Sequence, residues 1–399
     1  MQSSDPGHFF ETDAEQATRQ RRAAKAGNKY GNPITLKSKI LAAVVDPRAP
    51  SSTILVAESA GSVRRVNVDS GDTSTVYRGP TAPVCCVAVG GPASKPILFA
   101  GCWDKAIWSW DLASKAPGRK YLGHSDFVNA VVCARIGGKD CLISGGADHK
   151  IMVWDVSSGA RLHTLQDSVI NMLKVQDLVV DPAASSEDGI CLVSASSDPH
   201  IRRWMITLDS WEQVTEPAPA EEPGAERRAI LEHETTVYKL VFDHDRDELD
   251  LWTSSGDGTA KCLSRMKGFT PDDSYTHGDH VRAVAVANGF VVTAGRDENV
   301  KFWDQSLGEL FCSLEGHFDE ITDLAILRGP DRPGARVCSV SIDGTVRTWP
   351  LITAGLQEIM EQQAKPATND VDEDKTGEEE ENLLTADEEA ELAALMDDD

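Results

Sequence analysis

Short apolar runs separated by Gly- and Asp-containing turns repeat along this chain, and each pair of runs predicts a β-hairpin. The clearest example begins with the apolar run Cys141–Ile143 and turns at Gly145–Lys150. A second run, Ile151–Val153, follows the turn and ends at the dipeptide Trp154-Asp155. Runs such as Val84–Val89 are apolar at consecutive positions, which is typical of strands that are buried on both faces. The pattern therefore predicts an all-β array.

A fixed spacing of polar and aromatic residues marks the same hairpin several times. A Ser or Thr stands four residues before an Asp, and a Trp stands six residues after that Asp. The full spacing occurs at Ser144/Asp148/Trp154, Ser194/Asp198/Trp204, Thr293/Asp297/Trp303 and Ser339/Asp343/Trp349. Degenerate copies occur at Ala100/Asp104/Trp110, at Thr253/Asp257/Leu263 and at Ala60 with Val66. Successive Asp residues lie 40 to 59 positions apart, a period that indicates an array of seven repeats.

This spacing, with its Trp-Asp endings, resembles the WD-repeat family over roughly residues 30–351. The resemblance implies an all-β, seven-bladed WD-repeat β-propeller, which forms one closed domain despite a length of 399 residues. It also implies that a His before a blade joins the Ser or Thr, the Asp and the Trp in a hydrogen-bonded tetrad. The complete tetrads are expected at His124, Ser144, Asp148, Trp154; at His277, Thr293, Asp297, Trp303; and at His317, Ser339, Asp343, Trp349. A Ser-His-Asp set also suits a hydrolase, but a catalytic triad is needed once, so the repetition favours a structural role.

The two ends of the array are expected to pair with each other. Ile34–Lys37 has the pattern of a lone strand, and the last repeat ends at Trp349-Pro350 without an outer strand of its own. By analogy with WD repeats, Ile34–Lys37 supplies this strand, because a closed ring leaves no exposed strand edge. Polar inserts at 181–189, 215–226 and 329–334 are expected to emerge on the wider bottom face.

Flanking segments divide the chain into a polar leader (1–29), the propeller (30–351) and an acidic tail (352–399). In the leader, Thr12 and Glu15 form a capping box that predicts a short helix from Asp13 to about Ala26. This basic helix suits nuclear import or partner docking, or else a solvated leader. The tail holds 17 acidic and two basic residues; after a possible helix over 352–363 its composition is that of disorder.

Composition narrows the classes of protein. A formal net charge of −25 disfavours binding to nucleic acid or to anionic membranes. Nine Cys residues without CxxC spacing indicate reduced thiols in an intracellular protein, cytoplasmic and/or nuclear, rather than a zinc site or a disulfide framework. The sequence contains no phosphate loop, zinc signature or nucleophile elbow. We therefore expect neither an enzyme nor a cofactor.

The resemblance places candidate contact residues on the top face, around the central channel. One set is the turn residue before each turn Asp; the other is the lead-in residue at the start of each innermost strand. From these sets we single out Trp103, Phe127, Arg296, Ile342, His280 and Lys39, because large apolar, aromatic or Arg side chains at exposed positions commonly form binding hot spots. The longer loop before the fourth blade adds the apolar residues Ile170, Met172 and Leu173, which either fold down as a local plug or bind a partner.

The function favoured by these features is a non-enzymatic scaffold that binds protein or peptide partners as a monomeric propeller within a multiprotein complex. A second hypothesis is an acidic escort that uses its tail to bind basic proteins such as ribosomal proteins or histones. A third is a substrate receptor of a ubiquitin ligase. The Trp-Asp-x-Arg motif of many such receptors is absent, because the Trp-Asp pairs continue into Leu112-Ala113, Val156-Ser157 and Gln305-Ser306.

Overall fold

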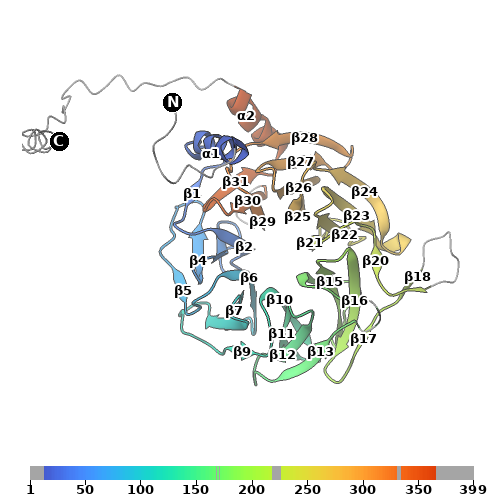
Figure 1. Ribbon diagram of the computed structural model, residues 1–399. Helices are drawn as coiled ribbons and strands as arrows, with labels where there is room; N and C mark the ends of the chain where they lie inside the picture. The colour runs from blue at the N-terminus through green and yellow to red at the C-terminus, as the bar shows by residue number, and fades with distance from the viewer. Residues whose placement is uncertain (1–12, 168, 170, 218–225, 330–333, 365–399) are drawn as a thin grey trace, which may run out of the picture. The chain divides into compact units, whose positions relative to one another are not determined.

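Seven antiparallel sheets surround a central channel in the described part of the chain (Figure 1). The structure is a computed structural model that describes residues 13–167, 169, 171–217, 226–329 and 334–364. In each sheet the strands follow the chain from the channel outwards and are joined by hairpins, except that the outermost strand of the last blade comes from the N-terminal end of the array. The predicted seven-bladed β-propeller is therefore confirmed.

The strands of the first three blades are given from the channel outwards. Blade 1 contains β2 (Ile40–Val45), β3 (Thr53–Glu58), β4 (Ser62–Asn67) and β5 (Val76–Arg78). Blade 2 contains β6 (Val84–Gly90), β7 (Ile97–Cys102), β8 (Ala106–Asp111) and β9 (Tyr121–Leu122). Blade 3 contains β10 (Val128–Ile136), β11 (Lys139–Gly146), β12 (Ile151–Asp155) and β13 (Arg161–Leu165).

The remaining blades follow the same order. Blade 4 contains β14 (Val175–Asp181), β15 (Gly189–Ser196), β16 (His200–Thr207), and β17 (Trp211–Gln213) with β20 (Ile230–Leu231). Blade 5 contains β21 (Val237–Phe242), β22 (Leu251–Ser255), β23 (Thr259–Ser264) and β24 (Thr270–Thr276), with the 3₁₀ turn η2 (Arg265–Lys267) before β24. Blade 6 contains β25 (Val281–Ala287), β26 (Phe290–Gly295), β27 (Val300–Asp304) and β28 (Glu309–Leu314). Blade 7 contains β29 (Ile321–Leu327), β30 (Arg336–Ser341), β31 (Thr345–Pro350) and β1 (Ile34–Thr35).

The ring is closed by the N-terminal strand, as the sequence predicts. In β1, Ile34 pairs with Val346 and Thr35 with Thr345 of β31, in antiparallel register. One residue later, the Leu36 amide donates to the Gly344 carbonyl over 2.8 Å. The observed strand is shorter than the expected 34–37, but it covers the outer edge of blade 7, so the ends of the array hold each other.

The core lies between the blades, because the strands present buried apolar side chains to the neighbouring blade. One cluster joins Ile143 and Val153 of blade 3 to Val175 and Leu192 of blade 4, and Trp204 is fully buried within it. Burying one side chain of this size contributes roughly 1.5–3 kcal/mol. Each blade therefore stabilises the next, and together they form a rigid frame around the channel.

The polar insert at 215–226, in blade 4, does not lie where the sequence predicted it. Both β17 and β20 pair with β16, at Trp204–Ile206 and at His200–Ile201 respectively. The insert thus interrupts the outer strand, and its hairpin of β18 (Glu216–Pro217) and β19 (Glu226–Arg227) projects from the outer rim (Figure 1). Because β17 already pairs with β16 before the insert begins, the insert leaves from the outer edge of the blade. The prediction that it emerges on the bottom face is therefore wrong.

Two helices pack on blades 6 and 7. The N-terminal helix α1 spans Asp13–Ala26, as predicted, and α2 spans Thr353–Ala364. In α2, Leu356 is fully buried in the cluster shared by blades 6 and 7, and the Gln363 side chain bonds the backbone of Glu315. The capping residue Thr12 and the tail at 365–399 lie outside the described residues.

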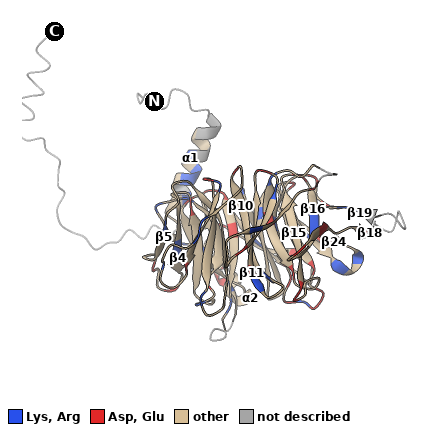
Figure 2. Ribbon diagram, turned by 90° about the horizontal axis from the view of Figure 1, so that it is seen from below, with Lys and Arg blue, Asp and Glu red and all other residues tan. Residues whose placement is uncertain are grey.

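Ion pairs dock α1 on the loops of blades 6 and 7. Arg21 lies 2.6 Å from Glu298, and Arg22 lies 2.6 Å from Asp319. Lys25 lies 3.5 Å from Glu298, whose side chain is only 2% exposed. The helix rises from one face of the disc (Figure 2). The end of this helix is therefore anchored on the propeller, while the Arg21 and Arg22 side chains stay 56% and 42% exposed.

Candidate interaction surface

Seven equivalent backbone hydrogen bonds assemble the top face. In every blade the amide of the turn residue donates to the carbonyl of the lead-in residue. The pairs are Ser59 with Lys39, Trp103 with Pro83, Ala147 with Phe127, Ser197 with Lys174, Gly256 with Thr236, Arg296 with His280, and Ile342 with Glu320, at 2.8–3.1 Å. The side chains of both predicted sets are therefore held on one rigid rim.

The most prominent apolar feature of this rim is a stacked aromatic pair. Trp103, from the turn of blade 2, and Phe127, from the lead-in of blade 3, have ring centroids 5.0 Å apart and an interplanar angle of 14°. Both remain accessible, with 42% and 37% of their surfaces exposed. Stacking fixes the two rings without burying them, so they form a preformed apolar platform.

The other predicted contact residues differ in exposure. Arg296 and Lys39 are exposed, whereas His280 and Ile342 are half-buried beside them. In the loop before blade 4, Leu173 is 39% exposed, and its amide donates to Asp198 over 3.0 Å. Ile170 lies outside the described residues.

Met172 is the exception among the predicted contact residues. Its side chain is fully buried in the cluster between blades 3 and 4. The prediction that Met172 contacts a partner is therefore wrong, and this residue acts as the local plug that was the alternative.

A repeated β-bulge supplies a second ring of side chains that the sequence prediction missed. In each blade the pairing of the two innermost strands shifts after the first residue. The extra residues are Leu41, Cys85, Asn129, Gln176, Tyr238, Arg282 and Thr322, and all seven line the channel cavity. A bulge re-aims the side chain at its unpaired position. These residues stand two positions after each lead-in residue, and that spacing could have located them.

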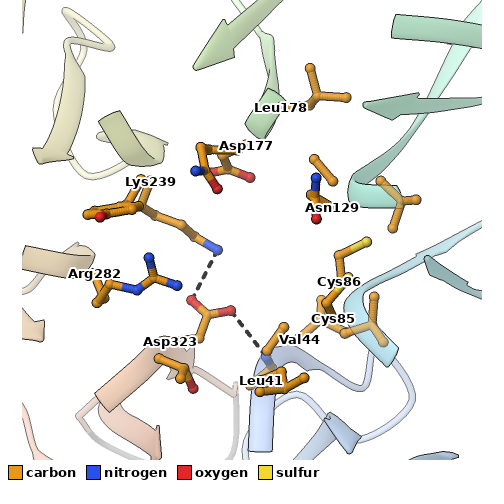
Figure 3. Close-up of a pocket in the computed structure, with 18 of the residues that line it drawn as sticks. Leu41, Val44, Cys85, Cys86, Asn129, Asp177, Leu178, Lys239, Arg282 and Asp323 are labelled. Carbon is orange, nitrogen blue, oxygen red and sulfur yellow. Dashed lines mark hydrogen bonds and ion pairs between the residues drawn. The ribbon is translucent and has the colours of Figure 1, made fainter. Parts of the chain in front are cut away.

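The channel below this ring is a cavity of about 360 Å³. Lys239 lies 3.0 Å from Asp323, which also accepts the Ala43 amide over 3.1 Å. Asp177 accepts the Leu240 amide over 2.9 Å. Figure 3 shows Lys239 and Arg282 pointing towards Asp323. These bonds link blades 1, 4, 5 and 7 across the channel and help to hold the rim.

Protonation in the channel follows from burial and from the neighbouring charges. Burial lowers the pKa of Lys239, but the carboxylates of Asp323 and Asp177 outweigh it and raise that pKa above its usual value. Lys239 is therefore charged at neutral pH. For Asp177, burial raises the pKa and exceeds the opposing effect of Lys239. The channel thus holds a strong cation beside a carboxyl that protonates more readily than usual.

The three expected tetrads are assembled as hydrogen-bonded units. In blade 3, His124 lies 2.9 Å from Asp148 and 2.8 Å from Ser144, and the Trp154 indole donates to Ser144 over 2.9 Å. The same contacts join His277, Thr293, Asp297 and Trp303 in blade 6, and His317, Ser339, Asp343 and Trp349 in blade 7. Each set lies inside a blade and away from the channel.

Comparisons with known proteins agree with this geometry. The family model "WD domain, G-beta repeat" matches residues 71–111, 115–155 and 308–350. The chain carries WD repeats, and its structure is a seven-bladed β-propeller. Such propellers are typically non-enzymatic scaffolds that bind protein partners.

Relatives of this WD-repeat protein resemble it at low identity. A WD repeat-containing protein of Schizosaccharomyces pombe is 26% identical over the full length of both chains. Nuclear distribution protein PAC1 of Arthroderma otae is 28% identical over 71% of this chain and 53% of its own length. Small ribosomal subunit protein RACK1 of Drosophila melanogaster is 27% identical over 33% of this chain and 54% of its own length. The WD-repeat chain thus spans about half of PAC1.

Two blades of the propeller that lack a complete tetrad, blades 4 and 1, contain buried ion pairs near the same turns. In blade 4, which has no His before it, Arg202 donates to Asp167 and Asp198 over 3.0 and 3.1 Å and is fully buried. In blade 1, Glu58 is 1% exposed and accepts from Arg64 over 2.9 Å. The repeat spacing located Asp198, but the sequence analysis missed Arg202, Asp167, Glu58 and Arg64, because these four stand outside the aligned tetrad positions.

The thiols of the protein are free and mostly buried. All nine Cys residues are unpaired, and burial raises the pKa of Cys312 and of Cys338 to about 12. Such thiols are protonated and unreactive at neutral pH. Within the described ranges, no three His, Cys, Asp or Glu side chains are grouped as a metal site requires. No helix there has the length and apolar character needed to cross a membrane.

The tetrad carboxylates make stability depend on acid pH. Burial raises the pKa of Asp297, but the hydrogen bond from His277 and the charge of Lys301 lower it overall to about 2. Because an unfolded Asp titrates near 3.9, Asp297 stabilises the fold above that pH. We expect about 2 kcal/mol to be lost as the pH falls from about 4 to 2.

Urea unfolding across this pH range measures the effect. Asp297→Asn should reduce stability at neutral pH and flatten the acid limb of the profile. Asp247→Asn, which changes an exposed carboxyl, is the control and should leave the profile unchanged. An acid limb of the same slope in Asp297→Asn and the wild type would contradict this role.

Proposed function

We propose that this WD-repeat protein is an interaction scaffold that binds a protein or peptide partner on its top face during assembly of a multiprotein complex. The observation that carries the proposal is the exposed Trp103–Phe127 stack at the channel mouth. Exposed aromatic side chains held on a rigid frame lose little conformational freedom on binding. Arg296, exposed on the same rim, is the third proposed contact.

Other features of the chain are consistent with a scaffold. Its relative RACK1 is named a small ribosomal subunit protein, as a component of an assembly would be. The free thiols fit a reducing compartment, so we propose the cytoplasm or the nucleus. The escort hypothesis depends on residues 365–399, which lie outside the described part, and it stays a prediction.

Truncation of the top-face side chains tests the proposal. The triple variant Trp103→Ala, Phe127→Ala, Arg296→Ala should weaken the principal partner by at least about 2 kcal/mol, because hot-spot side chains commonly contribute that much. Its melting temperature should change little, since none of the three is buried. Affinity purification followed by titration of the recovered partner measures the effect.

A matched triple on the opposite face provides the control. Arg135, Met266 and Leu307 are also exposed and lie at the ends of strands that point away from the top rim. Their replacement by Ala should leave binding unchanged. If the top-face triple retained every partner and the control triple lost one, the proposed surface would be wrong.

A further inference from the structure

The acidic side chains on the top loops of blades 1–4 are turned inwards and already engaged. Asp148 is held by His124, and Asp167 and Asp198 are both held by Arg202. These three carboxylates are 3%, 0% and 10% exposed. Of the two remaining acids, Asp104 is bonded by Trp108 and Lys120, and Asp126 accepts the Phe127 amide. Apart from the half-exposed Asp126, little negative charge therefore faces outwards here.

The basic side chains on the same loops are unpaired. We define the lysine sector as Lys37, Lys39, Lys105, Lys150 and Lys174, which are exposed or half-exposed. Within the described part of the chain, none of their ammonium groups has a hydrogen-bond or ion-pair partner. Lys105 stands two residues from Trp103, and Lys174 lines the channel mouth together with Trp103. The stack therefore lies among cations on a protein whose formal charge is −25.

The opposite part of the rim has a different character. On blades 6 and 7, Glu298 and Asp319 hold the basic residues of α1, and Glu320 holds Arg282 at 3.2 Å. The exposed Glu234 belongs to blade 5. Arg296 is the exposed cation on that side, so a ligand that seeks several unpaired cations next to an apolar platform is directed to blades 1–4.

A buried hydrogen-bond donor lies beside the stack. Asn129 is the bulge residue of blade 3, two positions after Phe127, and its Nδ2 atom is buried without a hydrogen-bond partner. A buried unpaired amide donor costs free energy. A carbonyl or carboxylate oxygen that arrives from the channel mouth would satisfy it. Asn129 thus points to a ligand rich in acceptors.

Taken together with the proposed function, on which this inference rests, these observations identify a kind of partner. We propose that the lysine sector binds an acidic peptide segment of another protein, with one aromatic or aliphatic side chain of that segment on the Trp103–Phe127 stack. Carboxylates on either side of the anchor pair with Lys105, Lys150 and Lys174. An acceptor oxygen of the segment takes the Asn129 Nδ2 proton in a hydrogen bond.

Selection from a display library of random peptides tests the class of partner. The full chain is the target, and the double variant Trp103→Ala, Phe127→Ala is used for counter-selection. We expect the enriched peptides to be net negative and to contain an aromatic or aliphatic residue. Enrichment of neutral or basic peptides that need the stack would overturn this inference and leave the proposed function standing. Failure to enrich any stack-dependent peptide would count against the proposed function itself.

Synthetic peptides test directly whether the bound segment must be negatively charged. Three peptides carry a central Phe flanked by Glu, Gln or Lys. The Glu peptide should bind at least about tenfold more tightly than the Gln peptide, and the Lys peptide should bind least. The advantage of the Glu peptide should shrink as salt rises from about 0.05 to 0.3 M, because screening shortens the reach of the charges. Equal affinities for the Glu and Gln peptides would refute the proposal.

Matched lysine variants test whether the preference for the Glu peptide arises at the lysine sector. Lys105→Gln, Lys150→Gln, Lys174→Gln should weaken the Glu peptide about tenfold and leave the Gln peptide unaffected. Lys95→Gln, Lys115→Gln, Lys139→Gln changes three lysines that stand outside the top loops and should alter neither affinity. Equal losses in the two variants would show that net charge alone is responsible and would overturn the lysine sector as a site.

The acidic tail of this chain is the other candidate occupant. A synthetic peptide of residues 366–399 serves as a probe in the same titration. We expect it to bind the full chain more weakly than the selected peptides, because the proposal assigns the sector to another protein. Tighter, lysine-dependent binding of the tail peptide would assign the sector to this chain instead and would overturn the proposal.

Discussion

Deletion of residues 1–38 is expected to abolish cooperative unfolding of this propeller, whereas deletion of residues 1–26 should lower its melting temperature by only a few degrees. The longer deletion removes β1, whose Ile34 and Thr35 pair with β31, and exposes the outer edge of blade 7. An uncovered strand edge of this kind pairs with other chains. The shorter deletion removes α1 and its largely surface ion pairs, which contribute little to stability.

Buried polar contacts strengthen this expectation and place the boundary between the two deletions. Arg347 is 1% exposed, and its guanidinium donates to the Asn28 side chain over 2.8 Å and to the Tyr30 carbonyl. Removing these acceptors leaves a buried cation without its partners, which is costly. Residues from Asn28 onwards therefore belong to the folded ring.

Calorimetric melting and size-exclusion chromatography distinguish the two deletions. The chain lacking 1–26 should give one cooperative transition and a monomeric peak. The chain lacking 1–38 should aggregate or melt without a sharp transition. Similar melting curves for the two chains would refute closure of the ring by β1.

Replacement of Arg202 by Leu is expected to cost about 3–5 kcal/mol of unfolding free energy, which is the usual effect of removing one partner of a buried ion pair. Arg202 is fully buried between Asp167 and Asp198. Its loss leaves two carboxylates in blade 4 without their cation. Repulsion between these carboxylates and their desolvation cause the loss of stability. Asp167→Asn in the Arg202→Leu background should therefore recover part of the unfolding free energy.

Urea unfolding of single and double variants measures these differences. Arg228→Leu is the matched control, because Arg228 is exposed and, among the described residues, its guanidinium bonds only the Gln213 side chain. It should change stability by less than about 0.5 kcal/mol. A loss below about 1 kcal/mol for Arg202→Leu would show that the ion pair does not replace the missing tetrad.

Local spacing made most of the fold predictable. The Ser/Thr, Asp and Trp positions recur within hairpins, where neighbours in sequence are neighbours in space, so residues such as Ser144 and Trp154 could be paired without a structure. The bounds of α1 followed from an equally local capping signal, whereas the pairing of β1 with β31 was expected from the resemblance to WD repeats. The positions of Trp103 and Phe127 on the top rim followed from the repeat.

Apart from this ring closure, contacts between distant segments could not be predicted. Docking of α1 joins Arg21 to Glu298, 277 positions away, and no local pattern reports such a pair. Burial of Met172 depends on how blades 3 and 4 pack. The stacking of Trp103 on Phe127 likewise depends on the angle between two blades, so the sequence located both residues but not their contact.

Hydrogen exchange of the full chain, with and without its principal partner, tests the central claim most directly. Bound partner should slow exchange at residues 101–106, 125–131 and 172–178, which carry the stack and the channel rim of blades 2–4. Exchange at residues 113–118, 137–139 and 265–268, in turns at the opposite ends of the strands, should be unchanged. Protection confined to those opposite turns, or to residues 365–399, would contradict a scaffold that binds through its top face.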